Sequence, residues 1–183
     1  MSDPDTRHTA EAPATVEIRV NHPQQLFNSL DPSPFYERDL DEDAEAYIVD
    51  SADEFPLTRP LRLIIYLPAD PRLEQLDFGH AIQNYFTYRA DEARRRLRFF
   101  FRDGRRSFIV GLAFLFVCIA IRQLVLAVGH GLTAQIVDEG LYIVGWVAMW
   151  RPLEIFLYDW RPLRHRARLF AKLARIPVLV YQF

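Results

Sequence analysis

An uninterrupted run of apolar and small residues, Phe108–Ile121, limits the possible folds of this chain more than any other segment. Arg122 and Gln123 interrupt the run, and apolar residues then continue to Gly129. A helix over 107–129 would measure about 34 Å at about 1.5 Å per residue, enough to cross a hydrocarbon core of about 30 Å. We therefore predict a transmembrane helix over 107–129. The alternative is one long buried helix of a soluble domain, and the flanking residues decide between the two.

A second apolar stretch, residues 141–160, would also be about 30 Å long as a helix. It is less apolar than the first because Arg151, Pro152 and Glu154 lie inside it. Pro152 lacks a backbone N–H, so we expect a kink at this position. Arg151 and Glu154 are three residues apart and can form a local pair on one helix face.

The charges that flank these stretches favour a membrane hairpin. The connecting segment 130–140 contains no Lys or Arg, whereas both outer flanks are strongly basic. This is the positive-inside pattern, which predicts that both termini are cytoplasmic. The amino terminus is polar and does not resemble a signal peptide, so we expect residues 1–106 to stay inside, uncleaved. The flanking basic residues are Arg94, Arg95, Arg96, Arg98, Arg102, Arg105 and Arg106 before the first stretch, and Arg161, Arg164, Arg166, Arg168, Lys172 and Arg175 after the second.

Ionisable residues near the outer boundary are expected to pin the hairpin. Arg122 lies about 22 Å from the inner end of the first helix, near the outer boundary of the membrane. Asp138 and Glu139 immediately precede the second helix and are expected at the same depth. An ion pair between Arg122 and one of these acids would lower the cost of placing charge there. The alternative is that Arg122 lines a conduction or proton path, which two spans could enclose only as an oligomer.

A stripe of small residues on the first helix indicates a helix-packing face. Ala113, Ala120 and Ala127 recur at intervals of seven, and small side chains let another helix approach closely. The second helix of the hairpin is the simplest partner. A neighbouring protomer or another membrane protein would serve equally well.

The remaining sequence predicts a small cytoplasmic α/β layer built from both ends of the chain. Residues 1–14 are expected to be a disordered tail, and 15–106 a domain whose long helix approaches the membrane. Period-two or β-branched runs predict strands at Val16–Val20, Leu61–Leu67 and Val178–Phe183. The fold class is therefore an α+β membrane protein with a hairpin over 107–160 and about three strands.

Two further helices are predicted in this layer. Asp39 or Asp41 can cap a helix that runs to about Glu54, with acids in its first turn. A long helix over Leu73–Arg102 is expected to break at Gly104, just before the span. Its candidate core residues include Leu76, Ala81, Tyr85, Tyr88 and Leu97, and those of the shorter helix are Ala44, Tyr47, Ile48 and Ala52.

The segment 161–183 begins with a basic amphipathic helix over Pro162–Arg175. Such a helix is typical of a membrane surface, where its cations contact anionic headgroups. The alternative is a helix packed on the cytoplasmic domain with a solvated basic face. The candidate headgroup contacts are Arg164, Arg166, Arg168 and Lys172.

No catalytic, cofactor or metal site is predicted. The acidic run 39–45 resembles the start of an EF-hand loop, but Ala44 occupies the glycine position, so we interpret it as the acidic start of a helix or a docking surface for a basic partner. The single cysteine, Cys118, is expected to act as a small apolar residue. Asp77 and His80 could form a local pair. No glycine loop for nucleotides is present, and the basic residues are explained by topology rather than nucleic acid.

The segments SLDPSPFYERDLDEDAEAYI and WRPLEIFLYDWRPL resemble bacterial inner-membrane proteins of similar length and layout. The resemblance would cover most of the chain. It implies bacterial origin and the same topology, and it brings no activity, cofactor or site residues.

These observations favour a non-enzymatic, membrane-anchored adaptor or accessory subunit of an inner-membrane complex. Its expected partners are membrane lipid, other spans or a second copy, and a basic soluble protein. One alternative is a subunit of a small oligomeric channel or transporter, motivated by Arg122, Arg151 and Glu154. Another is a membrane-bound enzyme that acts at the inner surface and uses Asp77 and His80.

Overall fold

The computed structural model describes residues 12–71, 73, 75–128 and 131–183, and it divides into two compact units. The first, called here the α/β unit, comprises the chain up to Glu92 together with Arg166–Phe183. The second, the hairpin unit, is Ala93–His165. The elements in chain order are β1 (Ala14–Arg19), η1 (Pro23–Gln25), η2 (Phe35–Glu37), α1 (Glu42–Asp53), β2 (Leu61–Leu67), α2 (Phe78–Val128), α3 (Leu132–Glu154), η3 (Ile155–Asp159), α4 (Trp160–Leu173) and β3 (Val178–Gln182).

The α/β unit contains a three-stranded parallel sheet in the order β1-β2-β3. The predicted strands are confirmed, and both ends of the chain contribute to the sheet. Leu63 of β2 pairs with Val16 on one side and with Val178 on the other. The strands run parallel because a helical connection returns the chain to the same end of the sheet before each new strand.

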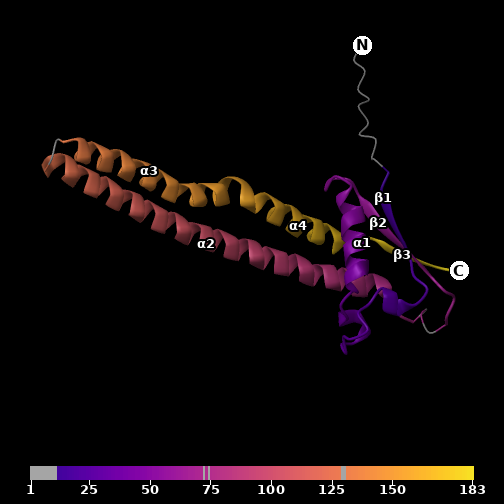
Figure 1. The fold of residues 1–183 in the computed structure, drawn as a ribbon. Helices are drawn as coiled ribbons and strands as arrows, with labels where there is room; N and C mark the ends of the chain where they lie inside the picture. Colours follow the sequence, from indigo (N-terminus) through magenta and orange to yellow (C-terminus); the bar gives the residue numbers. More distant parts are fainter. Residues whose placement is uncertain (1–11, 72, 74, 129–130) are drawn as a thin grey trace, which may run out of the picture. The chain divides into compact units, whose positions relative to one another are not determined.

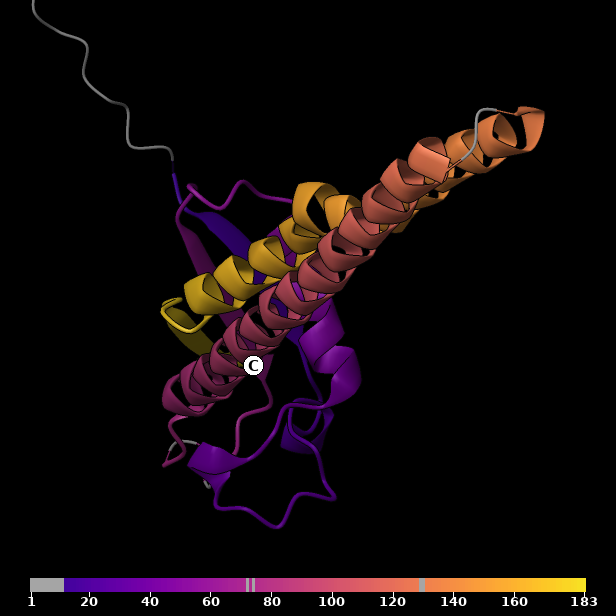
Figure 2. The ribbon, with the colours of Figure 1, turned by 90° about the vertical axis from the view of Figure 1, so that its left-hand side faces the viewer.

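One face of this sheet forms the core of the α/β unit. Val16, Leu63 and Ile65 point to that face and are almost fully buried. In Figures 1 and 2, α1 and the parts of α2 and α4 that belong to this unit lie on the same side of the sheet. No described helix lies over the opposite face in Figures 1 and 2, although Ile64 on that face is only 7% exposed. The largest fully buried side chains are Leu26, Ile48, Leu63, Ile65, Leu67, Ile82, Phe86, Leu169 and Leu173.

Helix α1 begins where the acidic run predicted. Asp41 is the N-cap, and its carboxylate accepts a hydrogen bond from the N–H of Asp43 at 3.1 Å. This bond satisfies one of the free donors at the helix start. Ala44 and Ile48 are buried as expected, whereas Tyr47, a predicted core residue, is half exposed because its ring reaches the edge of β1.

Helix α2 is continuous over 51 residues, so the predicted break at Gly104 is wrong. The helix starts after Asp77, whose carboxylate accepts the N–H of His80 at 2.9 Å. Ala81 and Tyr85 are buried as predicted, but Tyr88 is exposed. A glycine within a helix costs about 1 kcal/mol relative to alanine, too little to end a helix supported on both sides.

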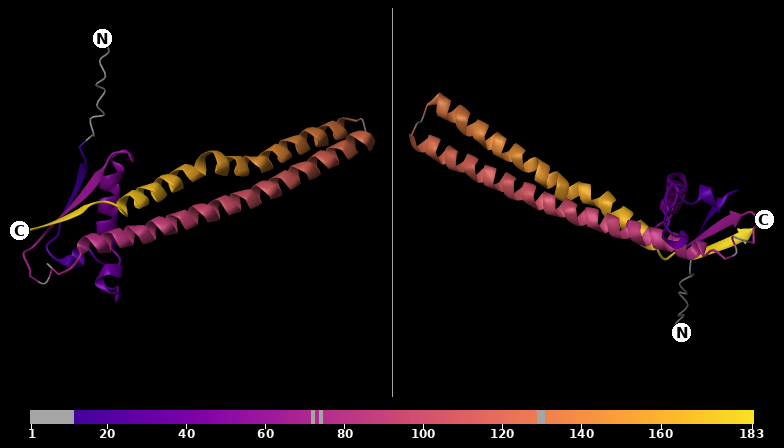
Figure 3. Two further views of the ribbon diagram at one scale, coloured as in Figure 1. Left: turned by 180° about the vertical axis from the view of Figure 1, so that it is seen from behind. Right: turned by 90° about the horizontal axis from the view of Figure 1, so that it is seen from below.

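In the hairpin unit, α2 and α3 lie side by side and run antiparallel (Figures 1 and 3). The second helix begins at Leu132 rather than near residue 141, so most of the predicted connection 130–140 is helical. Gly129 and His130 lie outside the described residues. The chain then continues through η3, a π-helical turn, into α4. Pro152, which cannot donate to the ladder, lies just before this turn, and π-turns accommodate such defects.

Candidate functional site

Glycine residues form a close contact surface, called here the glycine seam, between α2 and the segment α3–η3. A methyl group at Gly111 would lie 3.2 Å from the carbonyl oxygen of Ala148. At Gly145 it would lie 2.9 Å from a methyl carbon of Leu115. At Gly104 the corresponding distance to the Ile155 side chain is 2.8 Å. The two helices approach this closely only because these positions lack side chains.

Sequence reasoning missed this seam, although a signal was present. Gly104, Gly111 and Cys118 recur at intervals of seven, the same period as the alanine stripe. All three are buried in the structure. Cys118 therefore acts as a small packing residue, as expected, but at a specific place in the helix interface.

The predicted alanine stripe does not contact α3. Ala113, Ala120 and Ala127 are all exposed. Ala113 lies two residues after Gly111, which is a rotation of about 200° around the helix, so the two faces point in opposite directions. The second helix of the same chain is therefore not the partner of the stripe. A neighbouring protomer or another membrane protein stays a prediction.

The expected ion pair between Arg122 and Asp138 is present. The Nε of Arg122 donates to Oδ1 of Asp138, and Nη2 donates to Oδ2 at 3.2 Å. The guanidinium also lies over the ring of Tyr142 at 5.7 Å. Glu139 is exposed and belongs to the first part of α3 rather than to a loop. Because Arg122 is held by two groups of the same hairpin, this arrangement favours a structural role over a conduction path.

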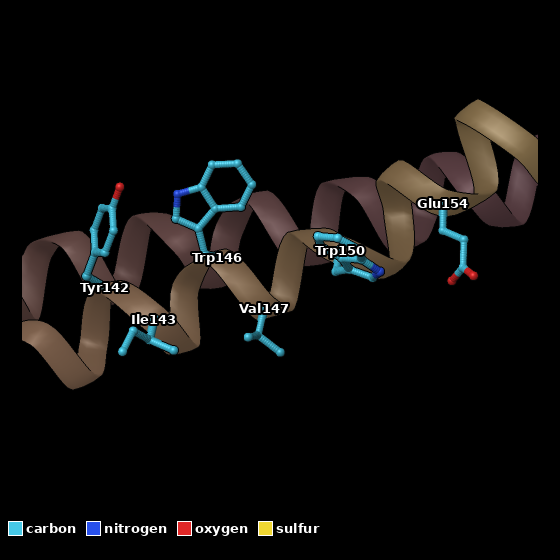
Figure 4. A pocket seen from close by; sticks show the side chains of 6 residues that line it. All are labelled: Tyr142, Ile143, Trp146, Val147, Trp150 and Glu154. Atoms are coloured by element: carbon cyan, nitrogen blue, oxygen red, sulfur yellow. The ribbon is translucent and has the colours of Figure 1, made fainter.

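A shallow groove of about 510 Å³ follows one face of α3 (Figure 4). Tyr142, Trp146, Trp150 and Glu154 follow one another at intervals of four, so each is adjacent to the next on the helix surface. Glu154 closes one end of an otherwise apolar surface. The side chain of Arg151 lies outside the described residues, so the predicted pair with Glu154 is not tested. The lining residues are Tyr142, Ile143, Trp146, Val147, Trp150 and Glu154.

The apolar face of α4 is used inside the α/β unit. Ala167, Phe170 and Leu173 are buried there, so this face is not free to enter a membrane surface. Lys172, a predicted headgroup contact, instead donates to the carbonyl oxygen of Pro56 at 3.1 Å, and burial lowers its pKa. The other predicted headgroup contacts, Arg164, Arg166 and Arg168, are exposed.

A polar network joins α1 to α2 within the α/β unit. The carboxylate of Glu45 accepts the hydroxyl of Tyr85 at 2.6 Å and Nη2 of Arg89 at 2.6 Å. Arg89 also donates to Glu92 at 2.9 Å and lies over the ring of Phe170 at 5.4 Å. Burial and the hydrogen bond to Glu45 raise the pKa of Tyr85, so its hydroxyl remains a donor. The charged side chains of Glu45, Arg89 and Glu92 therefore serve as tertiary contacts within the α/β unit.

The acidic segment before α1 is held by its own carboxylates. Asp31 accepts the backbone N–H groups of Ser33 at 2.9 Å and Asp39 at 2.8 Å. These bonds lower the pKa of Asp31, whereas burial and repulsion from Asp31 raise the pKa of Asp39. Among the described residues, no three His, Cys, Asp or Glu side chains gather as a metal site would require.

The pair proposed for an enzyme has a simpler role. The carboxylate of Asp77 is occupied with the backbone N–H of His80, which makes it the N-terminal cap of α2. Capping of this kind is the usual use of an aspartate immediately before a helix. This contact gives no sign of proton transfer between the two side chains.

Comparison with known proteins adds no family to these observations. No protein-family model, curated protein or solved structure matches the chain significantly. The function of the chain is therefore inferred from its residues and their geometry.

Proposed function

We propose that this chain is a membrane-anchored adaptor or accessory subunit of a bacterial inner-membrane complex. The observation that carries the proposal is the surface of the hairpin unit, where large apolar side chains point outward. In the most apolar part of α2, only 11% of the residues are buried. A core helix of a soluble protein would be mostly buried, and soluble monomers rarely expose apolar patches this extensive.

The dimensions of the hairpin support a span. The apolar part of α2, Phe108–Val128, would extend about 30 Å as a helix, which matches the hydrocarbon thickness. α3 accompanies it in the opposite direction, with close contacts at Gly111 and Gly145. Two helices in the described chain are long and apolar enough to cross a membrane.

The charge distribution supports an orientation with both termini in the cytoplasm. Arginines crowd the chain on both sides of the hairpin, whereas residues 131–140 contain only Asp138 and Glu139 as charged groups. A reporter fused to either terminus should therefore be cytoplasmic. A carboxyl terminus outside the cell would contradict this topology.

Two surfaces would serve an adaptor. The exposed alanine stripe, Ala113, Ala120 and Ala127, offers a smooth helix face to spans of another membrane protein. In the α/β unit, α1 exposes acidic side chains that would attract a basic soluble protein. These are Glu42, Asp43, Asp50 and Asp53.

The proposal is tested by gentle detergent extraction from native membranes, size-exclusion chromatography with light scattering, and mass spectrometry of co-eluting proteins. Stoichiometric co-elution of another membrane protein is expected. Ala120→Leu should reduce that co-elution, whereas Phe114→Leu, an exposed change outside the stripe, should not. Elution of the chain without any other protein would contradict the adaptor function.

The acidic surface needs its own variant. Asp43→Lys with Asp50→Lys should release a soluble partner while the membrane partner is retained. Glu17→Lys reverses an exposed charge on β1 and serves as the matched control. Equal losses from both variants would show that the acidic face of α1 has no specific role.

A further inference from the structure

The outer edge of β3 presents backbone N–H and C=O groups in the pattern that pairs with another strand. Leu63 N–H donates to the carbonyl of Pro177 at 2.9 Å, and Phe183 N–H donates to that of Leu67 at 3.0 Å. In a parallel ladder, successive residues direct their backbone groups to opposite sides. The N–H and C=O groups of successive β3 residues therefore point alternately toward β2 and away from it. The groups that point away from β2 belong to Val178, Val180 and Gln182.

The opposite edge of the sheet is protected. The outward carbonyl of Glu17 on β1 accepts the hydroxyl of Tyr47 from α1 at 3.0 Å. Proteins commonly cover or charge an edge strand to prevent pairing with other chains. In β3 neither device is visible: its residues carry no charge and no proline, and no hydrogen bond to its outward backbone groups occurs within the described part of the chain.

Three consecutive side chains of β3, those of residues 179–181, are also apolar and exposed. Leu179 and Val180 are each 40% exposed, and Tyr181 is 50% exposed. Leu179 and Tyr181 project from the uncovered face of the sheet, beside Tyr66, whose ring stacks on Tyr181 at 5.9 Å. Exposed apolar edge strands without charge or proline are normally avoided, so a strand with these properties at an open edge points to a missing neighbour.

We propose that β3 pairs with β3 of a second copy, antiparallel about a two-fold axis at Val180, to form a continuous six-stranded sheet. The alternating donors and acceptors of this edge match those of another strand, and the absence of charge along β3 favours a strand that is itself uncharged. A second β3 meets both conditions. A two-fold contact is isologous and reverses the strand, which makes the pairing antiparallel.

The side chains of this arrangement are mutually compatible. Residues equidistant from the axis face each other, so Val180 lies opposite its own copy. Leu179 then lies opposite Tyr181 of the second copy, and Val178 opposite Gln182. Aromatic–aliphatic pairs directly across an antiparallel ladder are favourable, and no like charges meet. The proposal concerns the α/β unit alone and does not depend on the membrane location of the hairpin.

Cysteine cross-linking of the full chain in native membranes tests the register. In a Cys118→Ala background, Val180→Cys should form a disulfide-linked dimer under mild oxidation, because paired residues are about 5.5 Å apart between Cα atoms. Val178→Cys and Gln182→Cys should each fail to form a disulfide when expressed alone, and they should cross-link to one another when co-expressed. Thr15→Cys on β1 is the matched edge control and should not cross-link.

A second measurement removes the pairing itself. Val180→Pro deletes an outward N–H that the sheet does not use, and proline is tolerated at such edge positions. Light scattering should then report half the number of copies per particle, whereas Val180→Thr should keep the dimer. A Val180→Cys chain that is labelled by maleimide but never links to itself, or that links to a different protein, would overturn the proposal. A dimer that persists in Val180→Pro would do the same.

Discussion

The two units of this protein place the same kinds of side chain in opposite positions. In the α/β unit, large apolar residues such as Ile65 and Phe86 are fully buried, and acids of α1 such as Glu42 and Asp50 face outward. In the hairpin unit, Phe116 and Trp150 face outward, and the buried positions are small ones such as Gly111 and Cys118. The contrast fits a difference in surroundings, with water around the α/β unit and, as proposed, hydrocarbon around the apolar part of the hairpin unit. Apolar side chains are inside where water surrounds a unit, and outward-facing ones are what a hydrocarbon environment would favour.

The strongest effect should come from deleting the same ring in each unit. Phe86 is 0% exposed and lies 6.2 Å from the ring of Phe170, so Phe86→Ala should lower the free energy of unfolding by about 3–5 kcal/mol. Phe116 is 62% exposed, and Phe116→Ala should change it by about 0.5 kcal/mol at most. Denaturant unfolding in detergent, followed by circular dichroism, measures both. Similar losses would contradict the inverted burial of the two units.

The glycine seam predicts effects of opposite sign at two glycines of the hairpin. Gly111→Ala should destabilise the helix pair by about 1–3 kcal/mol, because its methyl group would press on the Ala148 carbonyl. At Gly140 a methyl group meets nothing within 4 Å. Gly140→Ala should therefore stabilise the helix by up to about 1 kcal/mol through helix propensity. Thermal unfolding in detergent distinguishes the two variants. Destabilisation by both would contradict the assignment of Gly111, and not Gly140, to the contact between α2 and α3.

The ion pair of the hairpin is tested by one single and one double substitution. Arg122→Ala leaves the Asp138 carboxylate without its partner and should lower the thermal midpoint of the purified protein. Arg122→Ala with Asp138→Ala removes both charges and should recover part of that loss. Equal midpoints for the single and double variants would show that the pair does not stabilise the hairpin.

The weakest of these effects is a pH dependence in the α/β unit. Burial and repulsion from Asp31 raise the pKa of Asp39, so protonation of Asp39 favours the folded state. That contribution is complete below the ordinary value of 3.8 and is lost as the pH rises through the folded pKa. Asp39→Asn should therefore be more stable than the parent at pH 7, with the difference disappearing toward pH 3.

Asp31 provides the control of opposite sign. Hydrogen bonds from Asp39 and Ser33 lower its pKa, so its contribution is present above 3.8 and is lost as the pH falls through the folded pKa. Asp31→Asn should destabilise the unit at neutral pH. Unfolding curves at a series of pH values compare the two variants, and a shift of the same sign in both would contradict the assignment.

Local patterns predicted much of this fold. The alternation of apolar and charged residues predicted β1, and a β-branched run predicted β3. In the structure these two strands do not pair with each other, because β2 lies between them. Asp41 was a cap candidate because its position before an acidic first turn is a local signal. The break expected at Gly104 was wrong because the feature that occupies that position, the side chain of Ile155, lies on another helix. A local signal cannot reveal such a neighbour.

The same limit explains the candidate site. The pair of Arg122 with Asp138 was expected because opposite charges at matching depth have few other partners. The role of Lys172 was not expected, since its acceptor, the carbonyl of Pro56, lies far away in the sequence. The seam could have been found from the spacing of Gly104, Gly111 and Cys118. However, the alanine stripe has the same spacing of seven, and the sequence alone does not show which of the two contacts α3.

Side-chain chemistry along single segments was enough to predict the strands, the apolar part of α2 and the asymmetry of charge, but it did not predict the bounds of α3. Each of these features depends only on residues that are close together in the chain. Tertiary packing was needed to establish which face of α2 contacts α3, that α4 packs its apolar face on the sheet, and that β3 leaves one edge open. Those outcomes depend on which distant segments contact one another. A helix such as α2 has two faces of small residues, and only the packing of the folded chain decides which of them contacts α3.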